Sequence, residues 1–142
     1  MNIALMDESH VEQAIALWRR TPGVGLRSLD DSLDGIGKLL RRNPTTCFAA
    51  VLDHQVVGTV LCAHDGRRGH MYHLCVAANQ RRQGLGRALV RAALGALDAE
   101  GIRKVSLVVY SDNSSGLAFW QSLGWQLRSD LTYLDFAIEA QD

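Results

Sequence analysis

The chain has 142 residues, 47% of them apolar, and its 15 basic and 15 acidic side chains cancel at neutral pH. This length suits one compact domain, and the balanced charge argues against a nucleic-acid-binding protein, which normally carries a basic surplus. No apolar run approaches the roughly 18–20 residues of a membrane span, and the N-terminus lacks the features of a signal peptide. We therefore expect a cytoplasmic domain spanning residues 1–142, with neither nucleic acid nor membrane as a partner.

The first third of the chain predicts a strand followed by two helices. Residues 2–6 form the strand, and a helix follows to about Arg20, capped by Asp7 or by Ser9, with Glu12 completing a capping box from Ser9. Its apolar residues recur at the helical period and predict the buried face: Val11, Ala14, Ile15, Leu17 and Trp18. The segment 21–25 ends this helix, and a weaker helix is expected over about residues 31–42.

The middle of the chain predicts three strands and a long helix. Residues 47–52 and 55–63 form a hairpin, and residues 71–76 form the third strand. The helix runs from Gly84 to about Glu100, with Gly101 just beyond its end. Its expected apolar face comprises Leu85, Leu89, Ala92, Ala93, Ala96 and Leu97. The cysteines Cys47, Cys62 and Cys75 lie in these strands without CxxC spacing, which predicts reduced, buried thiols.

The last third predicts strands around one more helix. Residues 104–110 form a continuous apolar run, which favours a strand at the centre of a sheet covered on both faces. A helix from Asn113 to about Leu123 and two strands near 125–130 and 132–138 follow. The order β-α-α-β-β-β-α-β-α-β-β predicts a single-domain α/β fold, with a mixed β-sheet and helices on both faces.

The most informative segment links the third strand to the long helix. It contains Arg81 and Arg82 and then Gly84 and Gly86, at the point where the helix begins. The first N–H groups of a helix lack partners within it, and the helix dipole is positive there. The segment therefore predicts a site for a phosphate-bearing ligand, best a pyrophosphate. A nucleotide-hydrolase P-loop is excluded because no Gly-Lys-Ser/Thr follows the glycines.

Two stretches resemble the GNAT superfamily of acyl-CoA-dependent N-acetyltransferases. Arg81-Arg-Gln-Gly-Leu-Gly86 resembles the family's [Q/R]-x-x-G-x-[G/A] turn, and Leu74-Cys-Val76 resembles the L-x-V strand end before it. Asn113-Ser-Ser-Gly-Leu-Ala-Phe-Trp120, with Leu123-Gly-Trp125, resembles the family's N-x-x-A-x-x-x-Y-x-x-L-G-F segment. The element order is similar along the whole chain. The resemblance implies that acetyl-CoA is the cosubstrate, without a metal, and that the acetyl group passes directly to an amine in a ternary complex.

The resemblance also implies where coenzyme A binds. The main chain of Leu74, Cys75 and Val76 would pair with the pantetheine arm as a strand would, and the Val76 N–H would stabilise the thioester oxygen. The turn would hold the pyrophosphate, and Asn113 would bind the pantetheine. The implied coenzyme-binding set outside the strand end is Arg81, Arg82, Gln83, Gly84, Leu85, Gly86, Arg87, Asn113, Gly116 and Trp120.

The catalytic acid and base are less defined. Trp120 stands where the family places a tyrosine that protonates the departing thiolate, and an indole N–H cannot release its proton near pH 7. Water, Tyr110, Ser111 and Tyr133 are the alternative acids, and Trp120 can still donate a hydrogen bond to sulfur. Some relatives place a carboxylate where this chain has His70. A histidine there is a candidate base, although a surface histidine at the edge of a turn is the favoured interpretation.

Alternation along the third strand places Tyr72 on the face of His70 and His73 on the opposite face. A metal site is therefore not expected, and Cys75 is not expected to act as a nucleophile. Residues 21–31 are expected to select the acceptor, with Arg27, Asp30 and Asp31 as charged contacts; a plain surface loop is the alternative. The acceptor is a small-molecule or peptide amine, and a homodimer remains open. The alternative function is a non-catalytic acyl-CoA-binding sensor or regulatory module.

Overall fold

The computed structural model describes residues 1–139, which divide into two compact units. The first unit, Met1–Leu107, contains the whole sheet, and the second begins at Val108. In the first unit the elements are β1 (Asn2–Leu5), α1 (Glu8–Arg19), α2 (Leu33–Arg42), β2 (Phe48–Leu52), β3 (Gln55–His64), β4 (Gly69–Val76), the short 3₁₀ helix η1 (Ala78–Gln80), α3 (Leu85–Ala99) and β5 (Val105–Ser106). The second unit contains α4 (Ser114–Ser122).

The strands form one five-stranded sheet in the order β1-β2-β3-β4-β5. The pairs from β1 to β4 are antiparallel, and β5 pairs parallel to β4. A parallel neighbour needs a crossover connection, and α3 supplies it between β4 and β5. The mixed sheet predicted from the sequence is therefore confirmed.

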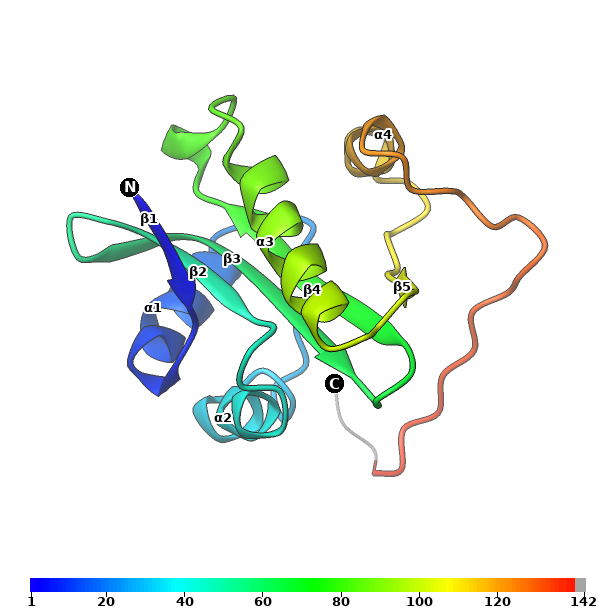
Figure 1. The fold of residues 1–142 in the computed structure, drawn as a ribbon, viewed down its shortest axis with the longest axis horizontal. Helices are drawn as coiled ribbons and strands as arrows, with labels where there is room; N and C mark the ends of the chain where they lie inside the picture. The colour runs from blue at the N-terminus through cyan, green and yellow to red at the C-terminus, as the bar shows by residue number, and fades with distance from the viewer. Residues whose placement is uncertain (140–142) are drawn as a thin grey trace. The chain divides into compact units, whose positions relative to one another are not determined.

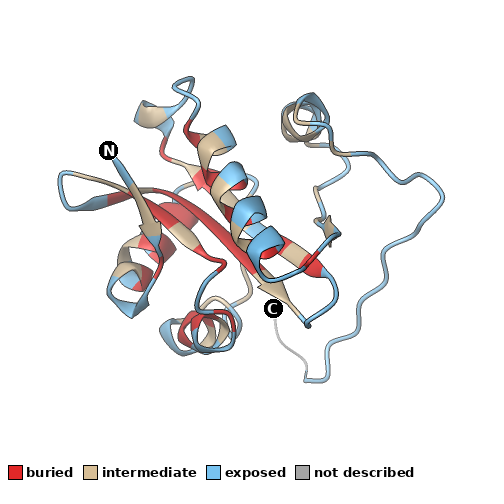
Figure 2. Cartoon of the chain, in the orientation of Figure 1, coloured by how far each residue is buried: buried red, intermediate tan, exposed pale blue. Residues whose placement is uncertain are grey.

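The sheet of the first unit lies between two helical layers (Figure 1). Helices α1 and α2 cover one face, and α3 covers the other. The largest cluster of buried side chains joins α1 and α2 to the sheet and includes Trp18, Leu17, Ile36 and Leu61. On the other face, Leu89 of α3 lies over Gly58, where an added Cβ would come within 3.0 Å of the leucine side chain. Figure 2 shows that burial is concentrated along the central strands between these layers.

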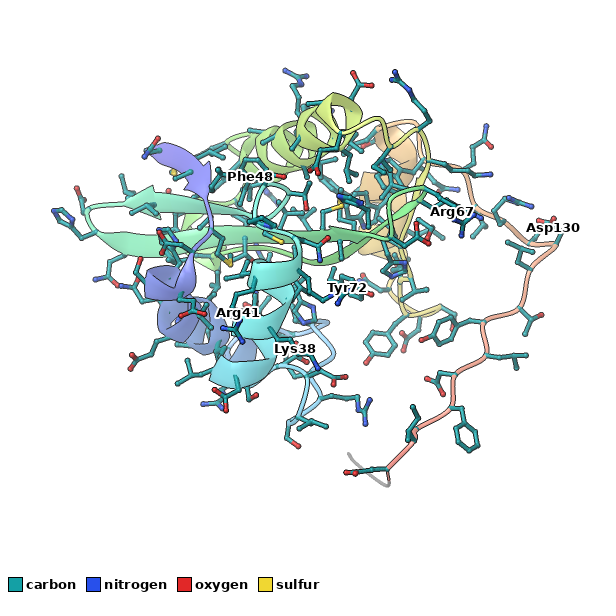
Figure 3. All side chains as sticks on the ribbon, turned by 60° about the horizontal axis from the view of Figure 1, so that its bottom comes forward. Lys38, Arg41, Phe48, Arg67, Tyr72 and Asp130 are labelled. Atoms are coloured by element: carbon teal, nitrogen blue, oxygen red, sulfur yellow. The ribbon has the colours of Figure 1, made fainter. Side chains whose placement is uncertain are left out.

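Local sequence signals explain the two helices of the first layer. Asp7 caps α1 by accepting a hydrogen bond from the Ser9 N–H at 2.8 Å, and the His10 Nδ1 accepts from the Asp7 N–H. The box is thus Asp7 with His10, and the predicted pairing of Ser9 with Glu12 is wrong, because the helix is capped two residues earlier, at Asp7. Ser32 caps α2. Arg41 Nη1 donates to Glu8 Oε1 at 2.6 Å and links the two helices (Figure 3).

A bulge interrupts β4 beside β3. Leu61 pairs with Tyr72 and Thr59 pairs with Cys75, so two residues of β4, His73 and Leu74, lie opposite Val60 alone. His73 takes a φ of 47°, in the left-handed region, which costs a non-glycine residue about 1–3 kcal/mol. The extra residue shifts the side-chain alternation of the strand. The prediction that His73 faces away from His70 and Tyr72 is therefore wrong.

Two predictions about the end of the chain are also wrong. Only Val105 and Ser106 of the expected strand 104–110 pair, and they lie at the sheet edge instead of its centre, because β5 has β4 as its single neighbour in the described sheet. Residues 125–139 contain no strand. No described strand pairs with this segment, and Leu134, Phe136 and Ile138 are 87%, 89% and 95% exposed.

Candidate active site

The turn that joins the end of β4 to the start of α3 contains two residues in the left-handed backbone conformation. Arg82 and Gly84 take positive φ values of 65° and 77°, and Gly84 is the N-cap of α3. Arg81 Nε donates to the Val76 carbonyl at 3.2 Å, which holds the turn against the strand end. Leu85 is buried and anchors the first residue of the helix in the core.

The N-terminus of α3 offers backbone donors to a ligand. The first helical bond runs from the Ala88 N–H to the Gly84 carbonyl, so the N–H groups of Leu85, Gly86 and Arg87 precede it. Within residues 1–139 no side chain caps this helix, and its first turn carries no acidic residue. A Cβ on Gly84 would meet nothing within 4 Å. The geometry therefore suits an anion, since the positive helix end is exposed and no carboxylate of residues 1–139 caps it.

One edge of β4 leads directly to this anion site. Pairing with β5 stops at His70 and Ser106, so residues 71–76 have no strand on that side in the described sheet. The Ala77 N–H donates to the Val57 carbonyl at 2.8 Å, which makes the neighbouring pair of Gly58 and Val76 a non-hydrogen-bonded one. The Val76 N–H therefore points away from β3, toward the open edge, as its predicted role requires.

The predicted base, His70, lies near the start of this open edge. Its Nδ1 lies 3.1 Å from Ser106 Oγ, and its ring lies 4.5 Å from the ring of Tyr72. Burial lowers the pKa of His70 from its usual value, so the imidazole is neutral at pH 7. Tyr72 points to the side of the sheet that α1 and α2 cover (Figure 3).

A second histidine on β4 has a carboxylate partner. His73 Nε2 lies 2.7 Å from Asp31 Oδ1, and the two side chains are 14% and 11% exposed. Burial of the Asp31 carboxyl opposes ionisation, but hydrogen bonds from His73 and from the Arg27 N–H outweigh it and lower the pKa of Asp31. Sequence analysis singled out Asp31 in the predicted acceptor loop but not His73, because strand alternation gives no sign of a bulge. The contact joins residues 42 positions apart.

The second unit, which begins at Val108, holds the remaining predicted residues. Asn113 caps α4 by accepting from the Gly116 N–H at 2.9 Å, which leaves its Nδ2 as a donor. A Cβ on Gly116 would lie 2.5 Å from that Nδ2, so a larger residue there would displace the capping side chain. The ring of Trp120 packs at 5.2 Å from Phe119 and at 5.0 Å from Trp125. Tyr110 is 60% exposed.

Residues 1–139 contain no group of three or more His, Cys, Asp or Glu side chains arranged to hold a metal ion. The three cysteines are buried and free, as predicted. Across the described part of the chain, every helix falls short of the length or hydropathy needed to traverse a bilayer.

Comparison with solved structures places this fold among acetyltransferases. An N-acetyltransferase of Thermoplasma acidophilum, solved with coenzyme A, superposes with a TM-score of 0.78 at 16% identity, covering 89% of this chain and 90% of that one. The aminoglycoside N-acetyltransferase AAC(6′)-Iy, solved with the bisubstrate analogue CoA-S-monomethyl-acetylneamine, superposes with a TM-score of 0.74 at 18% identity, covering 96% and 97%. The chain therefore shares the fold of these two solved proteins.

Sequence comparison identifies the family. The model of the acetyltransferase (GNAT) family matches residues 11–125. An acetyltransferase of Sodalis glossinidius (strain morsitans) is 28% identical over 134 residues, covering 94% of this chain and 93% of its own. The chain belongs to the acetyltransferase (GNAT) family, which confirms the resemblance and the prediction of an N-acetyltransferase enzyme.

Proposed function

We propose that this enzyme uses acetyl-CoA as its cosubstrate and transfers the acetyl group directly to an amine in a ternary complex. The observation that supports this best is the open edge of β4, which ends at the uncapped N-terminus of α3. A pantetheine arm carries amides that pair with a strand edge, and a pyrophosphate suits a helix N-terminus. One ligand joins these two groups in sequence, and that ligand is coenzyme A.

In this proposal the main chain of Leu74, Cys75 and Val76 pairs with the pantetheine. The pyrophosphate lies on the N–H groups of the turn formed by Arg81, Arg82, Gln83, Gly84, Leu85, Gly86 and Arg87, all but Leu85 and Gly86 being exposed. The Val76 N–H, which points to the open edge, donates to the thioester oxygen as negative charge develops there.

The roles that we propose for residues of the second unit rest on the family resemblance alone. Asn113 and Gly116 contribute to binding the pantetheine, and Trp120 packs on it or donates to the sulfur. Tyr110 is the candidate acid for the departing thiolate. We propose further that residues 1–142 act as one catalytic domain.

The acceptor we propose is a small-molecule or peptide amine in the cytoplasm. Support comes from AAC(6′)-Iy, whose bisubstrate analogue links coenzyme A to an acetylneamine. The segment 21–31 is the proposed acceptor loop, and Asp31 is fixed to β4 by its contact with His73. Nucleic acid and membrane are not proposed as partners, and a homodimer remains an additional prediction.

Binding is tested by isothermal titration calorimetry with acetyl-CoA. The Gly84→Glu variant places a carboxylate at the helix N-terminus and should weaken binding at least about tenfold, which corresponds to 1.4 kcal/mol. Gly66→Glu is the matched control, since Gly66 has a φ of 92° and its Cβ would also meet nothing within 4 Å. The control carries the same charge and a similar backbone strain in the β3–β4 turn. Equal affinity of the two variants would contradict the assigned phosphate site.

Transfer is tested by following the free thiol released from acetyl-CoA with a panel of polyamines, aminoglycosides and lysine peptides. We expect thiol release that depends on one class of amine, with kinetics in which both substrates bind before products leave. Saturable binding without turnover on any amine would contradict the proposal and favour the non-catalytic acyl-CoA sensor.

A further inference from the structure

The imidazole of His73 is held in one orientation by side chains from different elements. Asp31, in the loop before α2, accepts from Nε2 at 2.7 Å. The ring of Trp18 from α1 lies 4.7 Å away, and the ring of Tyr72 from β4 itself lies 6.4 Å away. Asp31 is the charged group that faces the imidazole, and the Arg27 N–H holds its second oxygen at 2.7 Å.

The backbone of His73 is fixed as firmly as its ring. Its carbonyl accepts from Thr59 Oγ1 at 2.9 Å, and this hydroxyl accepts in turn from Trp18 Nε1 at 2.8 Å. Trp18 and Thr59 are 1% and 0% exposed. The buried chain of hydrogen bonds, from Trp18 of α1 through Thr59 of β3, therefore holds the bulge in its left-handed conformation.

This arrangement leaves a basic nitrogen available. Because the Asp31 carboxylate can only accept, Nε2 carries a proton, and in the neutral imidazole Nδ1 therefore carries the lone pair. Among the described residues no group hydrogen-bonds to Nδ1. No side-chain N or O atom of this part of the chain is both fully buried and unpaired, so Nδ1, which has no hydrogen-bond partner there, is not fully buried. A carboxylate that orients an imidazole with an accessible lone pair is the arrangement expected of a general base.

We infer that His73, oriented by Asp31, is the general base that deprotonates the acceptor, an inference that rests on the proposed function. His73 Nδ1 accepts one proton from the alkylammonium, which would otherwise stay charged at pH 7 because its pKa is about 10.4. The freed nitrogen lone pair forms the C–N bond to the thioester carbon, and the C–S bond breaks with its electrons on sulfur. The second amine proton reaches the thiolate, and His73 returns its proton to water.

The position of His73 along β4 fits this role. It lies three residues before Val76, a span of at most about 10 Å between α-carbons, which an acceptor nitrogen and one water can bridge. His70 is a poorer candidate, because its Nδ1 already contacts Ser106 and no carboxylate of residues 1–139 contacts its ring. Its lowered pKa also makes it a weaker base.

The test compares His73→Asn with the matched control His54→Asn. Both positions have a positive φ, 47° and 63°, which asparagine tolerates, so each variant removes an imidazole without changing the backbone. With acetyl-CoA and the preferred alkylamine of the panel, His73→Asn should lower kcat/KM by about 10²-fold or more at pH 7. Its residual rate should rise with pH as the amine deprotonates unaided. Binding of acetyl-CoA by calorimetry should not change, and His54→Asn should behave as the wild type.

The Asp31→Asn variant provides a second measurement that does not depend on how His73→Asn folds. Removing the negative charge disfavours the imidazolium, so the acid limb of the kcat/KM profile should move to lower pH, with a lower plateau. An unshifted limb in Asp31→Asn, or a wild-type rate and profile in His73→Asn, would overturn this inference alone. Absence of turnover by the wild type on every amine would overturn the proposed function and this inference together.

Discussion

Replacing Thr59 with valine removes one hydroxyl from the core and nearly preserves the shape of the side chain. In the wild type this hydroxyl accepts from the Trp18 indole N–H and donates to the His73 carbonyl. The Thr59→Val variant leaves the indole N–H buried without a partner, since Trp18 is 1% exposed, and it also removes a donor from the His73 carbonyl. A buried polar group that loses its partner costs about 1–3 kcal/mol, so we expect a total loss of about 2–4 kcal/mol.

The assay is urea unfolding followed by far-UV circular dichroism, with thermal unfolding as a second measure. The expected loss corresponds to a fall in Tm on the order of 10 °C for a chain of this length. Thr59→Ser retains the hydroxyl and should cost only about 1 kcal/mol for the lost methyl group. Thr45→Val removes an exposed hydroxyl, which contacts Glu100, and should stay within about 0.5 kcal/mol of the wild type.

A double-mutant cycle assigns the loss to the hydrogen bond itself. Trp18→Phe removes the indole donor, so its cost in the Thr59→Val background should be smaller than in the wild type, with a coupling of about 0.5–3 kcal/mol. The reasoning is refuted if Thr59→Val unfolds with the same free energy as the wild type, or if the two substitutions are additive. A loss of stability without coupling would place the cost in packing instead.

Three further predictions concern other parts of the fold. Burial opposes ionisation of Asp31, but the hydrogen bonds from His73 and the Arg27 N–H lower its pKa below 3.8. Its contribution to stability is therefore present above that pH and is lost as the pH falls through the folded-state pKa. The free energy of unfolding should decline less steeply with acid in Asp31→Asn than in the wild type, and an identical decline would contradict the assignment. Asp7→Ala removes the cap of α1 and should cost about 1 kcal/mol in urea unfolding, whereas Asp34→Ala, in the first turn of α2, should cost less. Burial raises the pKa of the Cys47 and Cys62 thiols to about 11 and about 12. Iodoacetamide at pH 8 should therefore label neither thiol in the native protein and both in urea, as measured by mass spectrometry. Rapid labelling of the native protein would contradict this prediction and show that the sheet opens around these cysteines.

Local signals in the sequence were sufficient for most of the first unit. The apolar period of residues 11–18 placed α1, and the glycines after Arg82 placed the start of α3, because in each case the deciding contacts lie within one or two turns of chain. The bulge at His73 could not be predicted in this way. Neither His73 nor Leu74 is a residue type that favours a positive φ strongly, and the conformation is held by Thr59 and Trp18 from other elements.

The residues of the candidate site also divide into those that local sequence signals predicted and those that depend on contacts between distant elements. Arg81, Gly84 and Val76 were predicted because the anion site and the strand end are continuous in sequence, and the structure brings them together. The contact between Asp31 and His73 depends on the packing of the loop before α2 against β4, which no spacing in the sequence encodes. For the end of the chain, the apolar pattern predicted strands near 125–130 and 132–138, but the structure has no strand there. A strand forms only when a neighbouring strand pairs with it, and the pattern carries no information about such a neighbour.

The open edge of β4 has a consequence for hydrogen exchange. Along residues 71–76, amides that bond to β3 alternate with amides that face the open edge, except where the bulge interrupts the register. Protection should therefore differ sharply between sequence neighbours: the Ala77 amide, bonded to Val57, should exchange slowly, and the Val76 amide beside it should exchange quickly. Amide exchange should therefore distinguish the side of β4 that bonds to β3 from the side that is available to a ligand.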